Sequence, residues 1–295
     1  MGRRTQRPWE WFKAALEARG AAAGTVANYE LAFRQLKHLH EVRLRTLSTQ
    51  PEMIANEHTK LTKAGTPIGA NAMARFVRAV YRNAQKKTRG LPADLPTSGI
   101  DWNEEVPRKL ALAPSDLPAW EKERLALKNP IHRELALFLA LSGLRRRDAC
   151  SARWDELDVR CRVLRRPKPK GGEERAFNLP LSGAMVRCLW RVRAAGRMLH
   201  PVQAREWIFP AASASGHIEE IKTQKLSIHG HALRRSYAVF GRMAGVPHPI
   251  VKQLLNHAGS DVTEKHYTPD DPMLEFLCEQ QEKISRFVMA KLSAV

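Results

Sequence analysis

The stretch ELALFLALSGLRRRDAC, residues 134–150, decides how this chain folds. Apart from Glu134 its first half is apolar, and Pro130 precedes it, a residue favoured in the first turn of a helix. Gly143 ends the apolar run, and glycine commonly closes a helix because it accepts left-handed backbone angles without strain. We therefore predict a buried helix from Pro130 to Gly143 and a second helix that begins at Arg145.

Two short segments of β-prone residues follow this helical core. RCRVLRR, residues 160–166, and RAFNLPL, residues 175–181, flank the basic, glycine-containing stretch PKPKGGEE. This arrangement predicts an antiparallel hairpin with PKPKGGEE at its tip. Ser182 is suited to cap the next helix. We expect the remaining chain to be helical, with breaks near Gly216, Pro247 and Pro269.

The first third of the chain reads as four helices. Apolar residues recur at helical spacing behind Thr25, a suitable N-cap, and again over residues 70–84, while residues 8–19 and 52–63 form two further helical segments. Residues 90–118 contain five prolines and no sustained period, which is typical of a linker. The predicted fold is mainly α with a small antiparallel β-hairpin or sheet. It has a helical domain over residues 1–106, a linker over 107–117 and a second domain over 118–295.

The charge of the chain indicates its partner. Lys and Arg number 49 against 30 Asp and Glu, which gives a formal net charge of +19 and a pI near 10.3. Such an excess attracts polyanions, so nucleic acid is the expected partner. Five basic residues of the last predicted helix of the first third are expected either to contact DNA phosphates or to form a solvated face: Arg75, Arg78, Arg82, Lys86 and Lys87.

The cysteines and the N-terminus bear on the compartment. The four cysteines lie far apart, without CxxC or Cys/His ligand spacing, so we expect neither disulfides nor structural zinc. The N-terminal stretch has no apolar signal segment, and no apolar run approaches the length of a membrane span. We predict a soluble, cytoplasmic protein, associated with the nucleoid when bound to DNA, with no membrane partner.

The four tyrosines differ in their surroundings. Tyr29 and Tyr81 lie on or beside apolar helical stripes, and Tyr237 falls on the apolar stripe of its own segment, so all three are expected in the core. Tyr267 lies in TEKHYTPDD, where its neighbours on both sides are polar. This position suits a surface tyrosine or one that reacts.

Basic side chains surround Tyr267 in a defined order along the chain. HALRRSYA places His231 and Arg234 three residues apart, so that on a helix both side chains project from one face. An arginine after the glycine stop, a lysine at the hairpin tip and a histidine in LLNHAG are each ordinary alone. Their ordered recurrence is not, and the full series is Arg145, Lys170, His231, Arg234, His257 and Tyr267.

In this series, and in the residues that flank it, the chain resembles the tyrosine recombinases, the phage integrase family. The likeness spans residues 117–295 and includes SGLRRRDACSARWDELD, KGGEERAFNLPLS, HALRRSYA, LLNHAG and VTEKHYT. The helical first third is similar to the core-binding, DNA-binding domain of that family. No extra N-terminal arm-binding domain is expected, which favours a simpler, Xer-like or mobile-element recombinase.

The resemblance implies a reaction and the residues that carry it. Tyr267 attacks a phosphodiester of DNA and leaves a 3′-phosphotyrosine and a free 5′-hydroxyl, and the reverse reaction joins a different strand. Arg145 and Arg234 bind the nonbridging oxygens, which gain negative charge as the phosphorus becomes five-coordinate. Lys170 protonates the leaving 5′-oxygen, with Lys168 as a competing candidate for this general acid.

Three further side chains support this chemistry under the same resemblance. His231 assists the proton transfer from the tyrosine, His257 donates to the phosphate, and Asp148, one turn after Arg145, orients the arginines. Because a phosphotyrosine retains the bond energy of the phosphodiester, rejoining needs neither ATP nor a metal. The sequence contains no GxxxxGKS/T loop and no HExxH motif, so no cofactor is expected.

Assembly and function leave alternatives open. Residues 272–292 are predicted to form a helix with one partly apolar side, which in relatives docks on a neighbouring protomer; we expect a homotetramer on paired DNA sites unless this helix packs on its own domain. The other functional readings are a type IB topoisomerase without site preference and a non-catalytic DNA-binding protein on a recombinase scaffold. A two-metal nuclease is disfavoured, because the carboxylates that would bind the metals lie in a chain with many cationic side chains. These carboxylates are Asp155, Asp158, Asp270 and Asp271.

Overall fold

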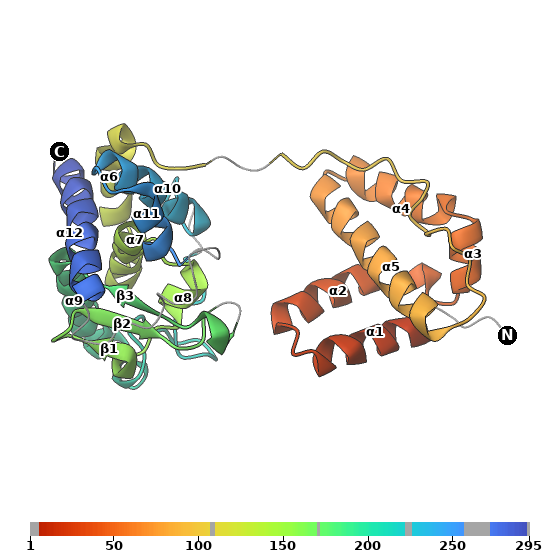
Figure 1. The fold of residues 1–295 in the computed structure, drawn as a ribbon, viewed down its shortest axis with the longest axis horizontal. Coiled ribbons are helices and arrows are strands. Elements are labelled where there is room, and N and C mark those ends of the chain that lie inside the picture. Colours follow the sequence, from red (N-terminus) through yellow and green to blue (C-terminus); the bar gives the residue numbers. More distant parts are fainter. Residues whose placement is uncertain (1–5, 107–109, 170–171, 222–225, 257–271, 294–295) are drawn as a thin grey trace. The chain divides into compact units, whose positions relative to one another are not determined.

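The structure of this protein is a computed structural model, which describes residues 6–106, 110–169, 172–221, 226–256 and 272–293. The chain divides into two units, residues 1–108 and 109–295 (Figure 1). Each unit buries a hydrophobic core of its own. The described residues form mostly helices and one small antiparallel sheet, which confirms the predicted fold class. No helix among them is both long enough and apolar enough to cross a membrane.

The first unit is a helical bundle. Its helices are α1 Gln6–Ala18, α2 Ala23–Gln35, α3 Leu44–Thr49, α4 Glu52–Lys63 and α5 Pro67–Lys87, with a 3₁₀ turn Lys37–Leu39. The long helix α5 packs against α1, α2 and α4 (Figure 1). The four predicted helices are present, whereas α3 is too short to display a sequence period. Helix α2 begins behind Ala22, so the prediction that Thr25 caps it is wrong.

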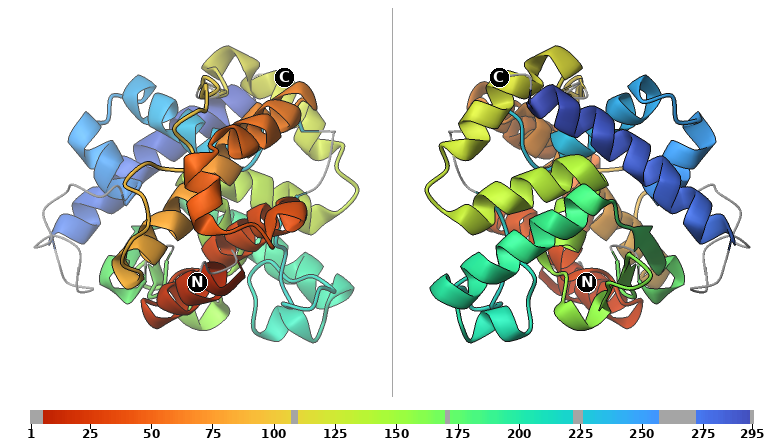
Figure 2. Two further views of the ribbon diagram at one scale, coloured as in Figure 1. Left: turned by 90° about the vertical axis from the view of Figure 1, so that its right-hand side faces the viewer. Right: turned by 90° about the vertical axis from the view of Figure 1, so that its left-hand side faces the viewer.

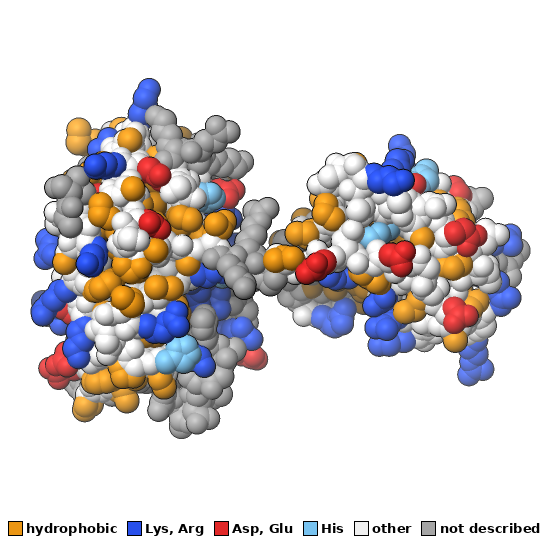
Figure 3. Space-filling model, turned by 90° about the horizontal axis from the view of Figure 1, so that it is seen from above, with side chains coloured by type: hydrophobic (Ala, Val, Ile, Leu, Met, Phe, Trp, Pro, Cys, Tyr) orange, Lys and Arg blue, Asp and Glu red, His pale blue; other side chains and the backbone are white. Residues whose placement is uncertain are grey.

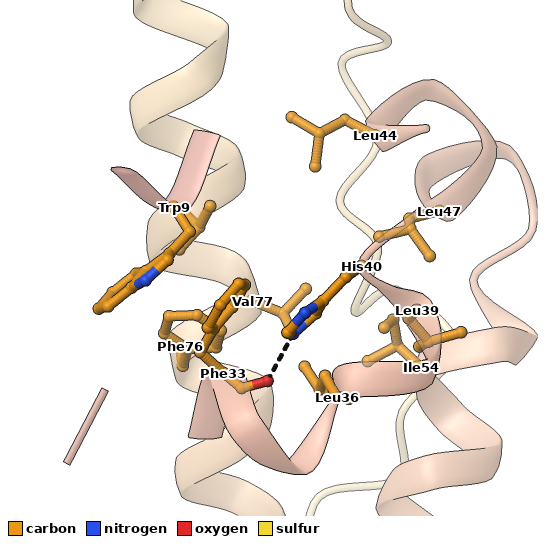
Figure 4. A pocket seen from close by; sticks show the side chains of 11 residues that line it. Trp9, Phe33, Leu36, Leu39, His40, Leu44, Leu47, Ile54, Phe76 and Val77 are labelled. Carbon is orange, nitrogen blue, oxygen red and sulfur yellow. Dashed lines mark hydrogen bonds between the residues drawn. The ribbon is translucent and has the colours of Figure 1, made fainter. Parts of the chain in front are cut away.

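Aromatic side chains dominate the core of the first unit. Trp9, Phe33 and Phe76, from three different helices, lie with their ring centroids 5.3 to 6.3 Å apart. His40 stacks on Phe33, and its Nε2 lies 2.8 Å from the Phe33 carbonyl oxygen (Figure 4). The cavity that these rings help to line is small, about 40 Å³, and it is lined mainly by apolar side chains.

Residues 91–105, which we term the anchored segment, belong to the first unit. Ile100 is buried in the core of this unit. The side-chain amide of Asn71 on α5 forms two hydrogen bonds with the backbone of Asn103: Nδ2 donates to the carbonyl at 2.9 Å, and Oδ1 accepts from the N–H at 3.1 Å. Asn71 is almost fully buried, so these bonds satisfy an amide that has no access to water. The prediction of a linker over residues 90–118 is wrong for this part, because its prolines occur in a segment that packs.

The second unit combines helices with a three-stranded antiparallel sheet. Its helices are α6 Leu117–Leu125, α7 Pro130–Ser142, α8 Arg146–Cys150, α9 Gly183–Leu199, α10 His231–Met243, α11 His248–Leu254 and α12 Pro272–Leu292, and its strands are β1 Leu157–Asp158, β2 Val163–Arg166 and β3 Phe177–Pro180. Short 3₁₀ turns are Pro114–Asp116, Trp154–Glu156, Glu173–Arg175 and Gln203–Arg205. The order β1-β2-β3, with Leu164 opposite Leu179, confirms the predicted hairpin and adds β1 to it.

Helix α7 is the centre of the second unit. Its last eight residues are all buried, and it packs against α6, α8, α9, α10 and α12. The predicted helix from Pro130 to Gly143 and the cap at Ser182, whose hydroxyl accepts from the Met185 amide at 3.2 Å, are confirmed. The expectation that the chain is helical beyond α9 is wrong for the described residues between α9 and α10, where prolines and serines leave only a 3₁₀ turn.

Helix α12 packs on its own unit. It contacts α6, α9, α10 and α11, and its side chains Leu277, Ile284 and Val288 are buried in the main core (Figure 2). The Glu282 carboxylate also accepts a hydrogen bond at 2.8 Å from the amide of Gly183, the first residue of α9. The apolar side of this helix is thus covered within the same chain. This is the alternative that the sequence left open, in which the helix packs on its own domain.

Gly143 closes α7 in a conformation that suits only glycine. Its φ is +60°, and a Cβ at this position would lie 2.7 Å from Leu255 Cδ2 and from two ring atoms of Tyr237. We expect Gly143→Ala to lower the free energy of unfolding by about 3 kcal/mol, since left-handed strain costs about 1 kcal/mol and overpacking about 2. Urea unfolding monitored by circular dichroism measures the loss.

Gly245→Ala is the matched control for this prediction. Gly245 lies in the same unit and also has a positive φ, +75°, but a Cβ there would meet no atom within 4 Å. This variant is expected to lose only the strain contribution, about 1 kcal/mol. Equal losses in the two variants would contradict the packing argument.

Candidate anion-binding site of the second unit

The end of α7 brings two of the predicted site segments together. Arg145 is the N-cap of α8, and Asp148 lies one turn later, while His231 is the first residue of α10 and Arg234 completes its first turn. Helix α7 packs against both α8 and α10. Three other predicted site residues lie outside the described residues: Lys170, His257 and Tyr267.

Arg234 is held between the C-terminal ends of two helices. Its side chain is buried, Nη1 donates to the Gly143 carbonyl at 2.8 Å, and Nη2 donates to the Leu255 carbonyl. Both carbonyls lie at helix C-termini, of α7 and α11, where the partial negative charge of the helix favours a cation. A guanidinium has five N–H donors, and these two bonds to described residues use two of them.

The guanidinium of Arg234 lies close enough to that of Arg145 for the two positive charges to interact. Burial and, after it, the positive charge of Arg145 together lower the pKa of Arg234 to about 10, while the charge of Asp148 opposes the shift. Arg234 therefore stays protonated at neutral pH. Arg145 is one-quarter exposed, and its Nη1 lies 3.8 Å from Asp148 Oδ2. Two guanidinium groups beside one carboxylate leave a net positive site, which is suited to an anion.

The structure separates the three consecutive arginines at the start of α8. Arg146 forms an ion pair with Glu220, and Arg147 is exposed. Arg145 is the one whose charge acts on Arg234 and whose guanidinium faces Asp148. Its position directly before the first turn of α8 gives this geometry, because residues three apart on a helix lie on one face.

A further arginine, Arg166, packs near the site and is not predicted by the sequence. Arg166, the last residue of β2, is almost fully buried, pairs with Glu156, and donates from Nη2 to Ser151 Oγ at 3.0 Å. Burial lowers the pKa of Arg166, and the charges of Glu156 and Asp148 counteract this. Arg166 thus connects the β-hairpin to α8. Its sequence context, the second of two consecutive arginines at the end of a short strand, contains no signal of this role.

Of the two lysines proposed as the general acid, Lys168 lies among the described residues. Lys168 Nζ lies 2.7 Å from Glu173 Oε1, and this hydrogen bond and ion pair raise the pKa of Lys168. A lysine with a raised pKa gives up its proton less readily. Lys170, the other candidate, lies outside the described residues.

His231 and Asn256 mark two further sides of the site. His231 is exposed and follows Gly230, whose φ of +56° turns the chain into α10. Asn256, the residue before His257, has a φ of +47° and donates from Nδ2 to the Arg175 carbonyl at 3.3 Å. The end of α11 therefore meets the loop between β2 and β3, and the Leu255 carbonyl that binds Arg234 immediately precedes Asn256 in the chain.

The carboxylates considered for a metal site are engaged elsewhere. Asp155 lies 3.2 Å from Arg153, and Asp158 lies 3.1 Å from Arg165. Within the described ranges no group of three His, Cys, Asp or Glu side chains is placed to hold a metal ion. Asp270 and Asp271 lie outside those ranges.

The basic row on α5 has mixed roles. Arg75 forms an ion pair with Glu105 at 2.6 Å, and the Arg78 guanidinium lies 4.8 Å from the centre of the Trp102 ring, so both help to hold the anchored segment. Arg82, Lys86 and Lys87 are exposed, and the Lys87 ammonium lies 5.9 Å from the Trp11 ring. On the face drawn in Figure 3, Lys and Arg side chains are spread over each unit.

A second basic feature of the first unit is not predicted by the sequence. Arg43, Arg45 and Arg89 line a pocket of about 390 Å³ together with Trp11, and we term it the arginine pocket. Arg45 Nη2 donates to the Gly90 carbonyl at 2.6 Å, which fixes its side chain. Arg43 and Arg45 flank Leu44, but Arg89 lies 44 residues after Arg45, so no single run of charge in the sequence reveals the cluster.

Comparison with known proteins adds a family match. Residues 123–273, just over half of the chain, match the model of the phage integrase family. The prophage integrase IntF of Escherichia coli strain K12 is 28% identical over 236 residues, which cover 73% of this chain and 48% of that protein. The chain thus spans about half the length of this curated relative.

Solved structures share the fold. The Tn1549 transposon integrase in complex with transposon right end DNA superposes with a TM-score of 0.63 at 16% identity, over 94% of this chain and 98% of that one. A lambda integrase tetramer bound to a Holliday junction gives a TM-score of 0.63 at 15% identity, over 95% of this chain and 78% of that one. At these identities the likeness concerns the fold alone.

Proposed function

This chain belongs to the phage integrase family, and from that premise we propose that it is a site-specific DNA recombinase that cuts and rejoins double-stranded DNA. Tyr267 forms a 3′-phosphotyrosine intermediate, without ATP or a metal ion. The observation that carries the proposal is the pair of guanidinium groups of Arg145 and Arg234, set close together beside Asp148 at the end of α7.

The two arginines hold the scissile phosphate. During attack the phosphorus becomes five-coordinate and its nonbridging oxygens gain negative charge, which guanidinium groups stabilise by charge-assisted hydrogen bonds of about 1.5 to 3 kcal/mol each. Arg234 is already fixed by two helix ends before DNA arrives, so it loses little freedom on binding. Asp148 and the buried Arg166 hold α8 and the hairpin around Arg145.

The remaining roles concern protons. A tyrosine of ordinary pKa is ionised in roughly one part in a thousand at pH 7, a handicap of about 4 kcal/mol. His231 accepts or relays the proton of Tyr267, and His257 donates to the phosphate. Lys170 protonates the leaving 5′-oxygen, and the ion pair between Lys168 and Glu173 supports this choice.

DNA binding is spread over both units. We assign the first unit to the core-binding role, with phosphate contacts from the exposed Arg82, Lys86 and Lys87 and from the arginine pocket. Arg75 and Arg78 contribute less, because both already hold the anchored segment. The Tn1549 and lambda integrases, solved in complex with DNA, support the assignment through their shared fold. Such an enzyme acts in the cytoplasm, where its DNA lies.

We further propose that the protein works as a homotetramer on paired DNA sites. The lambda integrase tetramer on a Holliday junction supports this through its shared fold. The apolar side of α12 is covered by α7 and α10 in the same chain, so exchange of this helix between protomers would first require it to leave its own core. Protomer contacts of the tetramer are therefore assigned to other surfaces.

Covalent capture from a library tests the reaction. The protein is incubated with random-sequence duplexes and fragments of host DNA, in EDTA and without nucleotide, and DNA linked to protein is collected after denaturation in SDS. We expect adducts in which the attached strand resists a 3′-exonuclease but not a 5′-exonuclease, since the protein blocks the 3′ end. We also expect one sequence to be strongly enriched among them.

Other outcomes favour the other functions. Adducts without sequence enrichment, together with relaxation of any supercoiled plasmid, would show a type IB topoisomerase. Retention of DNA that is lost at high salt, without SDS-resistant adducts, would show a binding protein only. Adducts that disappear in EDTA would contradict the metal-free mechanism.

A further inference from the structure

A buried polar network joins α12 to the helices of the anion-binding site. Gln281 of α12 is fully buried. The Tyr237 hydroxyl of α10 donates to Gln281 Oε1 at 2.7 Å, and Gln281 Nε2 donates to the Leu141 carbonyl of α7 at 2.8 Å and to Ser285 Oγ at 3.2 Å. One side chain thus ties α12 to both α7 and α10, in a region without access to water.

The bonds of Gln281 require an amide. Its oxygen accepts from a phenol while its nitrogen donates to a backbone carbonyl, and an ionised carboxylate can only accept. Burial raises the pKa of Tyr237, so the phenol remains protonated and keeps its role as the donor. An apolar residue at position 281 would leave the Tyr237 hydroxyl and the Leu141 carbonyl buried without these partners.

From Tyr237 the contacts continue to Arg234. The Tyr237 ring lies directly against Gly143, where an added Cβ would come within 2.7 Å of two ring atoms. The Gly143 carbonyl in turn accepts the 2.8 Å hydrogen bond from Arg234 Nη1. Gln281, Tyr237, Gly143 and Arg234 therefore form an unbroken series of contacts, and a shift of α12 displaces the group that holds the arginine.

We propose that Gln281 is a positioning residue that makes the geometry of Arg234 depend on the seating of α12. The inference rests on the proposed function, in which Arg234 binds the scissile phosphate. Helix α12 begins at Pro272, five residues after Tyr267. The helix that follows the nucleophile and the arginine that binds its target are thus parts of one packed arrangement. When α12 detaches from α7 and α10, Arg234 is no longer held in position to bind the phosphate, and cleavage stops.

Two neighbouring glutamines allow a matched experiment. Gln281→Leu is compared with Gln280→Leu, because Gln280 is also buried on α12 but its amide oxygen accepts from Lys283 of the same helix at 3.3 Å. Single-turnover cleavage is measured on a nicked duplex at saturating protein, and affinity is measured separately. We expect Gln281→Leu to cleave roughly 10- to 100-fold more slowly with affinity within about threefold, and Gln280→Leu to stay within about threefold in both.

A second measurement identifies Arg234 as the group affected. A methylphosphonate at the scissile position removes the charge of one nonbridging oxygen and with it much of the demand on the arginine. On this substrate the rates of wild type and Gln281→Leu should differ by less than about threefold. On the normal phosphate, Tyr237→Phe should slow cleavage as Gln281→Leu does. The rate of the double variant should lie within about threefold of the rate of either single variant, since both changes interrupt the same series of contacts.

Hydrogen exchange tests the network without any chemistry. In Gln281→Leu the amides of residues 143–146 and 254–256 should exchange faster than in wild type, whereas in Gln280→Leu they should not. Unchanged exchange in Gln281→Leu, or equal effects of the two glutamine variants on cleavage, would overturn the inference. A wild-type protein that forms no adduct would instead refute the proposed function, and the exchange data would still decide the role of Gln281.

Discussion

Tyr267→Phe is expected to abolish the covalent joining of this protein to DNA. The change removes one oxygen, the atom proposed to attack the phosphorus. The cations that hold DNA are untouched, so affinity should stay within about threefold of wild type. The assay is an SDS gel of a nicked duplex bearing the captured site, in which the released fragment makes cleavage irreversible.

Tyr29→Phe is the control for this loss. Its ring packs against the aromatic core of the first unit, 5.3 Å from Phe12 and 5.8 Å from Phe76, and the change keeps the ring. That variant should form the full amount of adduct. Adduct that persists in Tyr267→Phe would remove Tyr267 from the nucleophile role, and the labelled peptide would then identify the residue that attacks.

Arg234→Lys is expected to slow cleavage by about a thousandfold, equivalent to about 4 kcal/mol of transition-state stabilisation. A lysine ammonium has three donors on a single atom, and it cannot bond the Gly143 and Leu255 carbonyls while also holding a phosphate in two places. The positive charge is retained, so DNA affinity should fall only about threefold. Single-turnover rates at saturating protein measure the effect.

The adjacent arginine provides the comparison. Arg235 lies on the same helix but is exposed, so Arg235→Lys should cleave within about twofold of wild type. Circular dichroism and thermal unfolding of Arg234→Lys would verify that the fold persists. A rate within about tenfold of wild type in Arg234→Lys would show that this arginine does not bind the reacting phosphate.

Local rules of the sequence predict much of the fold. Pro130 and Gly143 mark helix ends by their backbone preferences and Ser182 by its capping hydroxyl, and the structure confirms all three. Elements without such signals are not predicted: α3 and β1 are too short to show a period. The anchored segment is not predicted either, because the burial of Ile100 depends on helices far away in the sequence.

The candidate site, like the fold, is predicted in part from the sequence. The order of its residues predicts the family, and the glycine stop before it already singles out Arg145 from the three consecutive arginines, whereas the contacts of these side chains are not predicted. The partners of Arg234 come from the ends of two other helices, and Arg166 and Gln281 matter only through burial. No local pattern encodes such long-range contacts, so these supporting residues had to come from the structure.

The anchored segment has a practical consequence for chimeric recombinases. Trp102 and Asn103 complete the surface of α4 and α5, and Asn71 loses its buried partner without them. A chimera that joins a foreign first unit at Gly90, just after the end of α5, would separate the helices of that unit from their own anchored segment and fold poorly. The productive crossover point lies after Glu105, so that a transplanted first unit includes its own anchored segment.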